Sequence, residues 1–518
     1  MELADVLAQL EVVKEQNRVL SERIHALMKE NEGLRHRMDE LCRRFFGRKA
    51  EHVDPAQLAL AFAQLDAEAA AAAPAEASAE ATSEPSADPA ASAAPATPRA
   101  GHGRNRPAAH LPRRRVMHEP APQDCVCSGC QKPMKRIDEE VSEQYDYVPA
   151  SFVVIEHVRG KYACPTCKEG VVIAPVPDKV IEKGLATEGV IAQVVVSKFG
   201  DHVPLARQTQ IYAREGVHLP RSTLLGFVGN AADLLSPVAA AIKAAVLASK
   251  VIGADETPVE VKNATTGTRT GFFWPYIGQG AEVYFDYTPS RAGEGPSKLL
   301  AGYGGYLQVD GYSGYDACVR LYKLILVGCW AHARRYVYRA LGNEPVRAAL
   351  LLALISRLYD VERDAKGMGE AGRWALRQKR SRPIIEKIKE KAAEFAATAI
   401  PKTPMGKALT YLTNQWEPLT RYLESGILEI DNTRTERSIR PLAIGRNNWV
   451  LAGSDEGARR AAILYTIVGS CKLAGANPFE YIRDVLRRVS TTPVSRAAEL
   501  TPANWLAERK RAAANSAA

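Results

Sequence analysis

Val251-Ile-Gly-Ala-Asp255-Glu-Thr-Pro-Val259 is the stretch that decides the fold of this chain. Its β-branched residues and small neighbours predict a strand with an acidic residue in the middle. Residues 271–278 and 282–288 follow as two more predicted strands, and the turns between the three segments contain the Gly, Asn and Thr of hairpin connections. The sequence therefore predicts a three-stranded meander whose first strand carries Asp255.

Two further acids are expected beside Asp255. Asp310 ends a predicted strand at 305–310, and residues 325–332 form another short strand that runs into a basic helix. Three antiparallel strands followed by alternating helices and strands is the order of a ribonuclease-H-like α/β sheet, in which the first strand lies next to the fourth. Glu436 then lies at the start of a late helix. This order predicts that the three acids meet at one edge of the sheet.

Three carboxylates in one place repel one another unless a cation lies between them. Mg²⁺ prefers oxygen ligands, and two such ions about 3.5–4 Å apart stabilise both the attacking and the leaving oxygen of a phosphodiester. Asn432 or Thr433 is expected to cap the helix of Glu436. Arg440 lies one turn further along the same helix face, where a cation beside a phosphate is useful. The pattern predicts metal-dependent chemistry on nucleic acid.

Each acid also has a purely structural interpretation. Asp255 could belong to a turn, with Glu256 as the more reactive neighbour. Asp310 could cap the glycine turn that follows it, and Glu436 could pair with Arg440. Each of these interpretations is reasonable for one acid alone, whereas the order of all three acids favours a site.

Cys329 and His332 stand at a Cys-x-x-His spacing between the second and the third acid. Two ligands alone make a weak metal site, so a structural or DNA-contacting role for His332 is favoured over a second metal.

The catalytic core is assigned to residues 249–450. Within it, residues 340–425 are rich in Ala, Leu, Lys and Arg at helical spacing, which predicts a helical insertion ahead of the helix of Glu436. A solvated face explains the basic residues of the insertion better than a DNA surface does.

Residues 119–178 contain two Cys-x-x-Cys pairs, in a chain whose nine cysteines are too unevenly placed for a disulfide framework. Four thiolates close a tetrahedral Zn²⁺ site, which is structural because no coordination position stays open. Residues 142–159 alternate like the strands of a zinc ribbon. Cys125 precedes the first pair and leaves open which cysteine is the first ligand. The predicted ligands are Cys127, Cys130, Cys164 and Cys167.

Residues 1–50 repeat apolar positions every seven residues, which predicts a coiled coil; an amphipathic helix packed on its own protein is the alternative. Asparagines at two seam positions favour a parallel dimer. Residues 51–118 are an Ala- and Pro-rich linker that is expected to be disordered and ends in a basic arm. The arm, with Arg113, Arg114 and Arg115, is either solvated or in contact with phosphates.

Residues 179–248 predict a helical domain. Helices are expected at 185–199, at 205–214, and from a cap at Ser222 or Thr223 to Leu235. Two helices joined by a short glycine-containing turn are typical of a helix-turn-helix, in which Arg207 faces phosphate, but they are equally common in plain helical domains. Residues 451–518 predict a C-terminal helical segment that loses its periodicity and frays after Ser490.

The net charge of +9 and the pI near 9.0 favour an acidic partner. The N-terminus is acidic and then heptad-patterned, unlike a secretion signal. No stretch approaches the roughly 20 apolar residues of a membrane span. A soluble, cytoplasmic protein without a membrane partner is expected.

Five motifs of this chain resemble the insertion-sequence sixty-six family of transposases. They are Gly253-Ala-Asp255-Glu-Thr-Pro258, Gln308-Val-Asp310-Gly-Tyr-Ser-Gly-Tyr315, Gly328-Cys-Trp-Ala-His332-Ala-Arg-Arg335, Asp431-Asn-Thr-Arg-Thr-Glu436-Arg-Ser-Ile-Arg-Pro441 and Ala452-Gly-Ser-Asp-Glu-Gly-Ala-Arg-Arg-Ala-Ala-Ile463. The resemblance covers essentially the whole chain. It implies a multidomain α+β protein in which coiled coil, zinc ribbon, helical domain and ribonuclease-H-like core follow one another.

The resemblance also implies a function. Asp255, Asp310 and Glu436 form an acid triad with Mg²⁺ (or Mn²⁺), and the protein binds the inverted ends of a mobile element and its target DNA. A homodimer or higher oligomer, small accessory transposition proteins and a nucleoid-associated location in a bacterial cytoplasm are further expectations. A non-catalytic zinc-containing DNA-binding regulator and a nuclease of the same fold are the alternatives. The candidate DNA-contacting residues are Arg113, Arg114, Arg115, Arg207, Arg437, Arg440 and Arg446.

Overall fold

The structure is a computed structural model. It describes residues 151–159, 161–163, 171–173, 179–181, 184–263 and 265–517, and two isolated positions, Arg18 and Ala63. The chain divides into two compact units, one of residues 74–158 and one that joins residues 1–73 to 159–518. The predicted coiled coil, linker, basic arm and zinc ligands lie outside the described residues and stay predictions, as do the domain boundaries.

Residues 151–159, predicted to belong to the strands of the zinc ribbon, form no strand. Val153 and Val154 are 80% and 97% exposed. Alternating apolar residues make a stable strand only where a partner strand and a core cover them, and no strand among the described residues pairs with this segment. Two short strands follow instead, β1 (Lys161–Ala163) and β2 (Val171–Ile173), which pair antiparallel.

Three helices precede the sheet, α3 (Glu188–Phe199), α4 (Leu205–Arg214) and α5 (Arg221–Leu247). α4 has the predicted bounds. α5 is longer than predicted, because it begins directly after Pro220 and continues through Pro237, where a helix was expected to stop. Its side chains on both sides of that proline are buried, so packing outweighs the lost backbone hydrogen bond.

The length and composition of α5 alone would allow it to cross a membrane. Half of its most apolar stretch is buried inside the protein, and it packs against β6 and α15. α5 is therefore best described as a core helix.

The sheet has seven strands, and its first predicted strand is in fact two. They are β3 (Val251–Ala254) and β4 (Thr257–Asn263), separated by Asp255 and Glu256. Both pair antiparallel with the same edge of the long strand β5 (Gly267–Ile277), and β6 (Val283–Thr288) pairs with the other edge. At this break Asp255 and Glu256 lie outside the strand pairing, while the sheet continues on both sides of them.

The remaining strands extend the sheet beyond β3 and β4. β7 (Tyr306–Gln308) pairs parallel with β3, and β8 (Ile325–Val327) pairs parallel with β7. β9 (Leu451–Ala452) pairs with β4. The fourth strand in chain order of the predicted sheet, β7, thus lies beside the first, which is the order predicted for a ribonuclease-H-like sheet.

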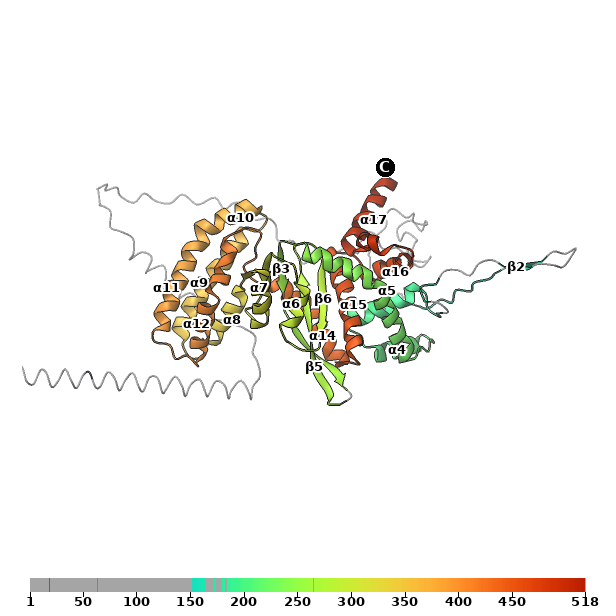
Figure 1. Cartoon of the computed structure of the whole chain (residues 1–518), viewed down its shortest axis with the longest axis horizontal. Helices are drawn as coiled ribbons and strands as arrows, with labels where there is room; N and C mark the ends of the chain where they lie inside the picture. Colours follow the sequence, from blue (N-terminus) through green and yellow to red (C-terminus); the bar gives the residue numbers. More distant parts are fainter. Residues whose placement is uncertain are drawn as a thin grey trace, which may run out of the picture. The chain divides into compact units, whose positions relative to one another are not determined.

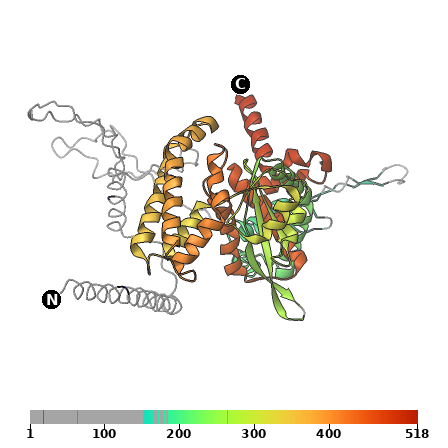
Figure 2. The ribbon, with the colours of Figure 1, turned by 60° about the vertical axis from the view of Figure 1, so that its left-hand side comes forward.

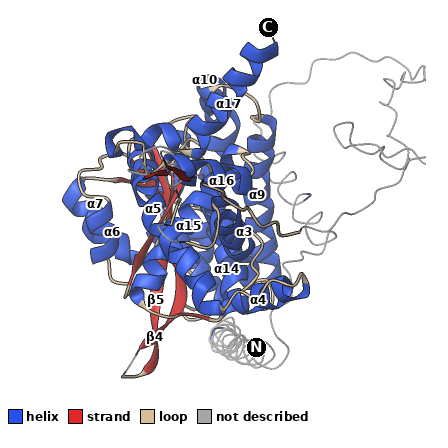
Figure 3. Cartoon of the chain, turned by 90° about the vertical axis from the view of Figure 1, so that its right-hand side faces the viewer, coloured by secondary structure: helices blue, strands red, loops and turns tan. Residues whose placement is uncertain are grey.

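Helices cover both faces of the sheet (Figure 3). On one face, Ile252 and Ala254 share a core with α5, α6 (Glu294–Leu299) and α7 (Asp316–Tyr322). On the other face lie α14 (Thr433–Trp449) and α15 (Asp455–Ala474). α14 packs so tightly that a Cβ at Gly253 would meet the Thr435 hydroxyl oxygen at 2.2 Å.

The helices between β8 and α14 form a bundle beside the sheet, drawn in yellow and orange in Figures 1 and 2. They bury a continuous cluster of Leu, Ile and Ala side chains that reaches Val251 and Val327 of the sheet. The helices are α8 (Trp330–Arg339), α9 (Pro345–Asp364), α10 (Glu370–Leu376), α11 (Arg382–Ala396), α12 (Pro404–Asn414) and α13 (Trp416–Thr420), with a π-helical turn at Arg377–Ser381 between α10 and α11.

Arg377, in the π-helical turn, is fully buried. Its guanidinium makes a bidentate pair with Glu362 at 2.8 and 2.7 Å, and donates to the carbonyl oxygens of Tyr422, Ser425 and Leu428 at 2.8–2.9 Å. This group of contacts, the Arg377 clamp, holds the segment that leads into α14.

The C-terminal segment does not fray after Ser490 as predicted. A 3₁₀ helix (Val494–Leu500) and α17 (Pro502–Ala517) follow α16 (Pro478–Arg488). Trp505 is buried, stacks edge-on against Tyr481 at 5.4 Å and donates to Asp484 at 2.8 Å. One aromatic anchor therefore orders a segment that lacks regular apolar spacing.

Candidate active site

Asp255 and Asp310 lie side by side at the carboxyl ends of neighbouring parallel strands. The register pairs Gly253 with Gln308, and each acid stands two residues beyond its member of that pair. Because parallel strands in register end at the same edge, the two carboxylates come to one place, as predicted.

Glu436 reaches the same edge from the first turn of α14. Asn432 is the residue before the helix, as predicted, but its side chain does not cap the helix. The Asn432 amide instead donates to the carbonyl oxygen of Ala254 at 2.9 Å, and the close approach at Gly253 brings Thr435 onto the same strand. The start of α14 is thereby fixed to the strand that carries Asp255.

The three acids influence one another electrostatically. The pKa of Asp255 is raised to about 8, mainly by burial and in addition by the nearby charges of Asp310, Glu256 and Glu436, while a hydrogen bond from the Glu256 backbone amide opposes the shift. A carboxyl with a strongly raised pKa beside other carboxylates is a candidate for a functional site.

Glu256, the alternative to Asp255, has a cation of its own. Arg291 pairs with it through two nitrogens, with Nε at 3.1 Å from Oε1, and stacks on the ring of Tyr312 at 3.9 Å. Burial raises the pKa of Glu256, and the bond from Arg291 opposes this. Because the charge of Glu256 is compensated, Asp255 is the stronger candidate for a metal ligand.

Asp310 also has the turn contact considered above. Its Oδ1 accepts a hydrogen bond from the backbone of Tyr312 at 3.0 Å, across Gly311 with φ +94°. Tyr411 of α12 donates to the Asp310 carbonyl oxygen at 2.8 Å. One carboxylate oxygen of Asp310 fixes the turn, and the insertion holds its backbone.

Glu436 is oriented by α8, and its contacts in the structure are with that helix instead of Arg440. His332 Nδ1 lies 3.4 Å from Glu436 Oε1, and an Arg335 nitrogen lies 3.7 Å from Oε2. Cys329, His332 and Glu436 bring one ligand atom each within 4.8 Å of one another.

A metal at this trio is not the best explanation of it. Burial raises the pKa of the Cys329 thiol to about 12. The Cys329 sulfur accepts a hydrogen bond from the backbone N–H of Asn432 at 3.2 Å. Burial lowers the pKa of His332, with the charges of Arg335 and Arg339 acting in the same direction and the Glu436 carboxylate opposing. A thiol that stays protonated is a poor metal ligand.

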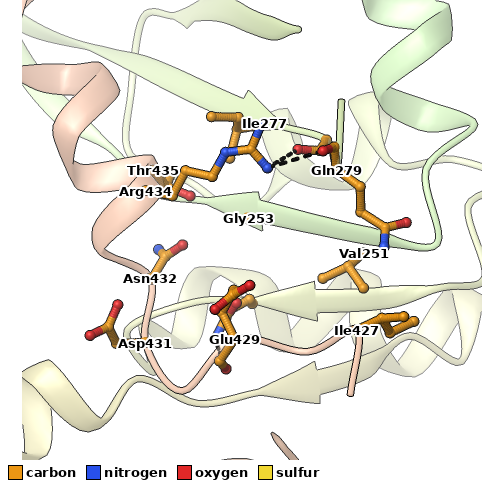
Figure 4. A pocket seen from close by; sticks show the side chains of 12 residues that line it. Val251, Gly253, Ile277, Gln279, Ile427, Glu429, Asp431, Asn432, Arg434 and Thr435 are labelled. Carbon is orange, nitrogen blue, oxygen red and sulfur yellow. Dashed lines mark hydrogen bonds between the residues drawn. The ribbon is translucent and has the colours of Figure 1, made fainter. Parts of the chain in front are cut away.

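A cavity of about 180 Å³ is lined by Val251 and Gly253 of β3 and by the segment that leads into α14. Figure 4 shows Asp431 and Asn432 on its wall and Arg434 reaching across to β5. Arg434 donates to the Gly278 carbonyl oxygen at 2.8 Å, and Asp431 accepts from Tyr359 at 2.9 Å. These contacts brace the start of α14 from both sides.

The described candidate DNA-contacting arginines differ in their surroundings. Arg437 and Arg440 are exposed on α14, and the hydrogen bonds and ion pairs of the described residues include none for either. Arg446 donates to Thr257 Oγ1 and the Pro258 carbonyl oxygen, both at 2.6 Å. Arg207 donates to Asn448 at 3.3 Å. Only the first two present a guanidinium that no neighbour occupies.

The donor set fits a divalent metal that prefers oxygen. Three carboxylates converge, and the charges of Asp310 and Glu436 act on Asp255. A cation among them would remove their mutual repulsion. Asp255, Asp310 and Glu436 are the residues that would hold it.

The fold is a mixed α/β sheet that brings a cluster of acids to the ends of its first and fourth predicted strands. Residues 183–460 match the model of the transposase IS66 family. The chain belongs to the IS66 transposase family.

Three further family models match other parts of the chain. Residues 124–168 match the zinc-finger binding domain of transposase IS66, residues 33–116 match the model described as transposase C of IS166 homeodomain, and residues 466–503 match the IS66 C-terminal element. The chain is thus a transposase with a zinc-finger domain, and its family implies zinc and a divalent metal.

Similar proteins occur in Sinorhizobium fredii (strain NBRC 101917 / NGR234). The uncharacterized protein y4hP is 33% identical over 432 residues, covering 78% of this chain and 76% of that protein. The uncharacterized protein y4jD is 32% identical over 420 residues, covering 77% and 81%. The relationship therefore extends over most of both proteins.

Several contacts at the site have no signal in the sequence. Arg291 and Tyr411 come from a loop and from the insertion, and no spacing links them to Glu256 or Asp310. Arg335 was visible only as part of a basic helix. Its one available signal is the helical spacing from His332, which places both on one face of α8.

Proposed function

We propose that this protein binds the inverted ends of an insertion sequence, cleaves the DNA there and joins the freed end to target DNA. Asp255, Asp310 and Glu436 are the catalytic acids. In the first step water attacks a phosphodiester and leaves a 3′-hydroxyl and a 5′-phosphate. In the second step that 3′-hydroxyl attacks a phosphodiester of the target, so that one ester bond forms as another breaks.

Asp255, Asp310 and Glu436 would hold Mg²⁺ or Mn²⁺, which would supply a lowered pKa for the attacking hydroxyl and a positive charge beside the leaving oxygen. Asp255 and Asp310 supply oxygens from the ends of two strands, and Glu436 supplies oxygens from the helix end. The protein contributes mainly by positioning. The observation that carries this proposal is the in-register pairing of β3 with β7, because it aligns Asp255 with Asp310.

DNA is proposed to lie along the exposed side of α14. Arg437 and Arg440 follow Glu436 on that helix, so a phosphate backbone in contact with them passes beside the acids. The basic arm with Arg113, Arg114 and Arg115, and Arg207 on α4, are proposed as further phosphate contacts. Arg446 is proposed to contribute mainly through Thr257, to which it is bonded.

The test is strand transfer by the purified full chain on labelled element-end DNA with Mg²⁺. Asp255→Asn, Asp310→Asn and Glu436→Gln are each expected to lower the rate by about 10³-fold, because each removes a charge that balances the metal. DNA binding measured on the same variants should stay close to that of the wild type. Near-normal strand transfer by any of the three variants contradicts the assignment.

Asp286→Asn is the matched control. Asp286 is a half-buried acid on β6 whose pKa is raised by burial, as for Asp255, but it lies outside the acid cluster. Its replacement should leave strand transfer unchanged. Cleavage without joined products would favour the nuclease, and binding without either reaction would favour the regulator.

Residues 1–50 are proposed to form a parallel dimer, so that one assembly holds two element ends. Zn²⁺ bound by Cys127, Cys130, Cys164 and Cys167 is proposed to stabilise the zinc-finger domain. A nucleoid-associated location and small accessory transposition proteins complete the proposal.

A further inference from the structure

His332 lies where the second helix of the site, α8, meets the third acid. Its side chain is 17% exposed, and both ring nitrogens face protein groups. Nδ1 lies 3.3 Å from the sulfur of Cys329 and 3.4 Å from Glu436 Oε1. Nε2 lies 3.2 Å from an Arg335 nitrogen. With both nitrogens engaged inside the protein, neither is available for a base or a phosphate of DNA.

The partner of Nε2 determines where the ring carries its hydrogen. Arginine can only donate hydrogen bonds, so Nε2 must accept from Arg335 through its lone pair. The ring hydrogen of the neutral imidazole is therefore on Nδ1.

The hydrogen on Nδ1 has two acceptors in reach, and they differ in strength. The Cys329 sulfur is a weak acceptor that already receives the Asn432 amide. Glu436 Oε1 is a buried carboxylate oxygen with no hydrogen bond in the structure. A buried carboxylate oxygen left unpaired is unfavourable, and a small turn of the imidazole satisfies it.

We propose that His332 is a positioning residue, which holds one carboxylate oxygen of Glu436 through its Nδ1 hydrogen so that the other oxygen faces the metal. The proposal rests on the proposed function. Cys329 and Arg335 fix the ring from two sides, and the bond between Asn432 and Cys329 ties α8 to the start of α14. A carboxylate has about four acceptor positions, so one imidazole does not exhaust it.

The test uses substitutions that place a donor at different points of the former ring. In His332→Asn the side-chain amide reproduces the position of Nδ1, in His332→Gln it approximates Nε2, and His332→Ala removes both. Mn²⁺ binding to the full chain is followed by electron paramagnetic resonance, and strand transfer is followed at increasing Mg²⁺. His218→Ala, at an exposed histidine after α4, is the matched control.

His332→Ala and His332→Gln are expected to weaken Mn²⁺ binding by about 10–100-fold, the range for residues that orient metal ligands. Strand transfer by these variants should recover in part at high Mg²⁺. His332→Asn should stay within about threefold of the wild type, and His218→Ala should match it.

Three results overturn the proposal. Equal Mn²⁺ affinity in the wild type and in all three His332 variants means that His332 does not position Glu436. An Asn variant as defective as the Ala variant means that the imidazole itself binds the metal. A loss of thermal stability common to all three His332 variants, with unchanged Mn²⁺ affinity, means that the residue is only structural.

The same titration separates this inference from the proposed function. A wild-type chain whose Mn²⁺ binding does not depend on Asp255 contradicts the proposed function and this inference with it. Binding that is lost in Asp255→Asn but unaffected in His332→Ala contradicts the role of His332 alone.

Discussion

In the helical insertion, the buried guanidinium of Arg377 has an acceptor for each of its five N–H groups, whereas at the acidic edge of the sheet buried oxygens of Glu256 and Glu436 have no hydrogen bond. The two regions adjoin in the chain, since the Arg377 clamp ends where the segment leading to α14 begins. The buried charge of Arg377 is thus fully paired, whereas the buried carboxylates at the acidic edge are incompletely paired.

The difference separates two uses of buried polar groups. A paired charge holds a structure in one arrangement, and breaking the pair is expensive. An unpaired charge weakens the fold and leaves capacity for a ligand that arrives later. The insertion therefore makes the structure rigid. The acidic edge has oxygens that can bind a ligand, and the rigid insertion holds them in position.

The largest effect is expected from breaking the Arg377 clamp. Arg377→Met should lower the free energy of unfolding by about 3–5 kcal/mol, because three carbonyl oxygens lose this donor while buried and Glu362 keeps the longer contact with Arg373 at 3.3 Å. Chemical denaturation measures it. Arg380→Met is the control, because Arg380 pairs with Asp364 on the surface, and it should cost about 0–1 kcal/mol. Equal losses in both variants would remove the contrast between the regions.

The acidic edge should reveal itself in the pH dependence of stability. Because the pKa of Asp255 is raised from 3.8 to about 8, between about pH 4 and pH 8 the unfolded chain has lost a proton that the folded chain retains. Stability without metal should therefore fall as pH rises through this window, by up to about 1.4 kcal/mol per unit. The difference in slope between the wild type and Asp255→Asn measures the effect.

Divalent metal should reverse this trend, because it binds the ionised acids. The thermal stabilisation by Mn²⁺ is expected to grow between pH 6 and pH 8, and to be absent in Asp255→Asn. A wild type and a variant with the same pH dependence would show that Asp255 ionises freely in the folded chain.

Substitutions of the arginines of α14 should differ in effect, according to whether the arginine already has a bonding partner in the protein. Arg440→Ala should weaken DNA binding for all sequences and reduce the slope of log K against log salt by about 1, because one phosphate contact is lost. Arg446→Ala should leave that slope unchanged and lower the stability of the chain, because its bonds to Thr257 and Pro258 are lost. The opposite outcome would place DNA at the other end of α14.

The smallest effect is expected at Val450, directly after α14. Its φ of 68° and ψ of −55° lie in a region that β-branched residues rarely adopt, and its side chain is exposed. Val450→Gly should raise the free energy of unfolding by about 1 kcal/mol. Val494→Gly, at an exposed valine with negative φ, should not. A destabilised Val450→Gly would mean that the strain at this helix end is compensated.

The sequence predicts the sheet order because hydrophobic alternation and turn residues act locally. Asp255, Asp310 and Glu436 could be expected at one edge because strand order fixes which ends meet. The division of the first strand into β3 and β4 was not visible, because a break at Asp255 and Glu256 depends on pairing with β5.

Contacts between elements that are distant in the chain could not be predicted from the sequence, for the same reason. The five bonds of Arg377 depend on how α9, the π-helical turn and the segment 422–428 pack. The anchor Trp505 depends on Tyr481 in another helix. Residues of these types are common in exposed helices, and only the assembled core selects a partner for them.

The outer edge of β6 is covered by side chains of α15, which affects how copies of the chain can associate. Its amides at Val283 and Phe285 donate to the hydroxyls of Ser470 and Thr466 on α15, at 3.1 and 2.9 Å. Two side chains thus occupy positions that a strand of another molecule would need, which protects the edge against aggregation by strand addition. Copies of the chain crowded together at the same DNA can come into contact there without their sheets merging.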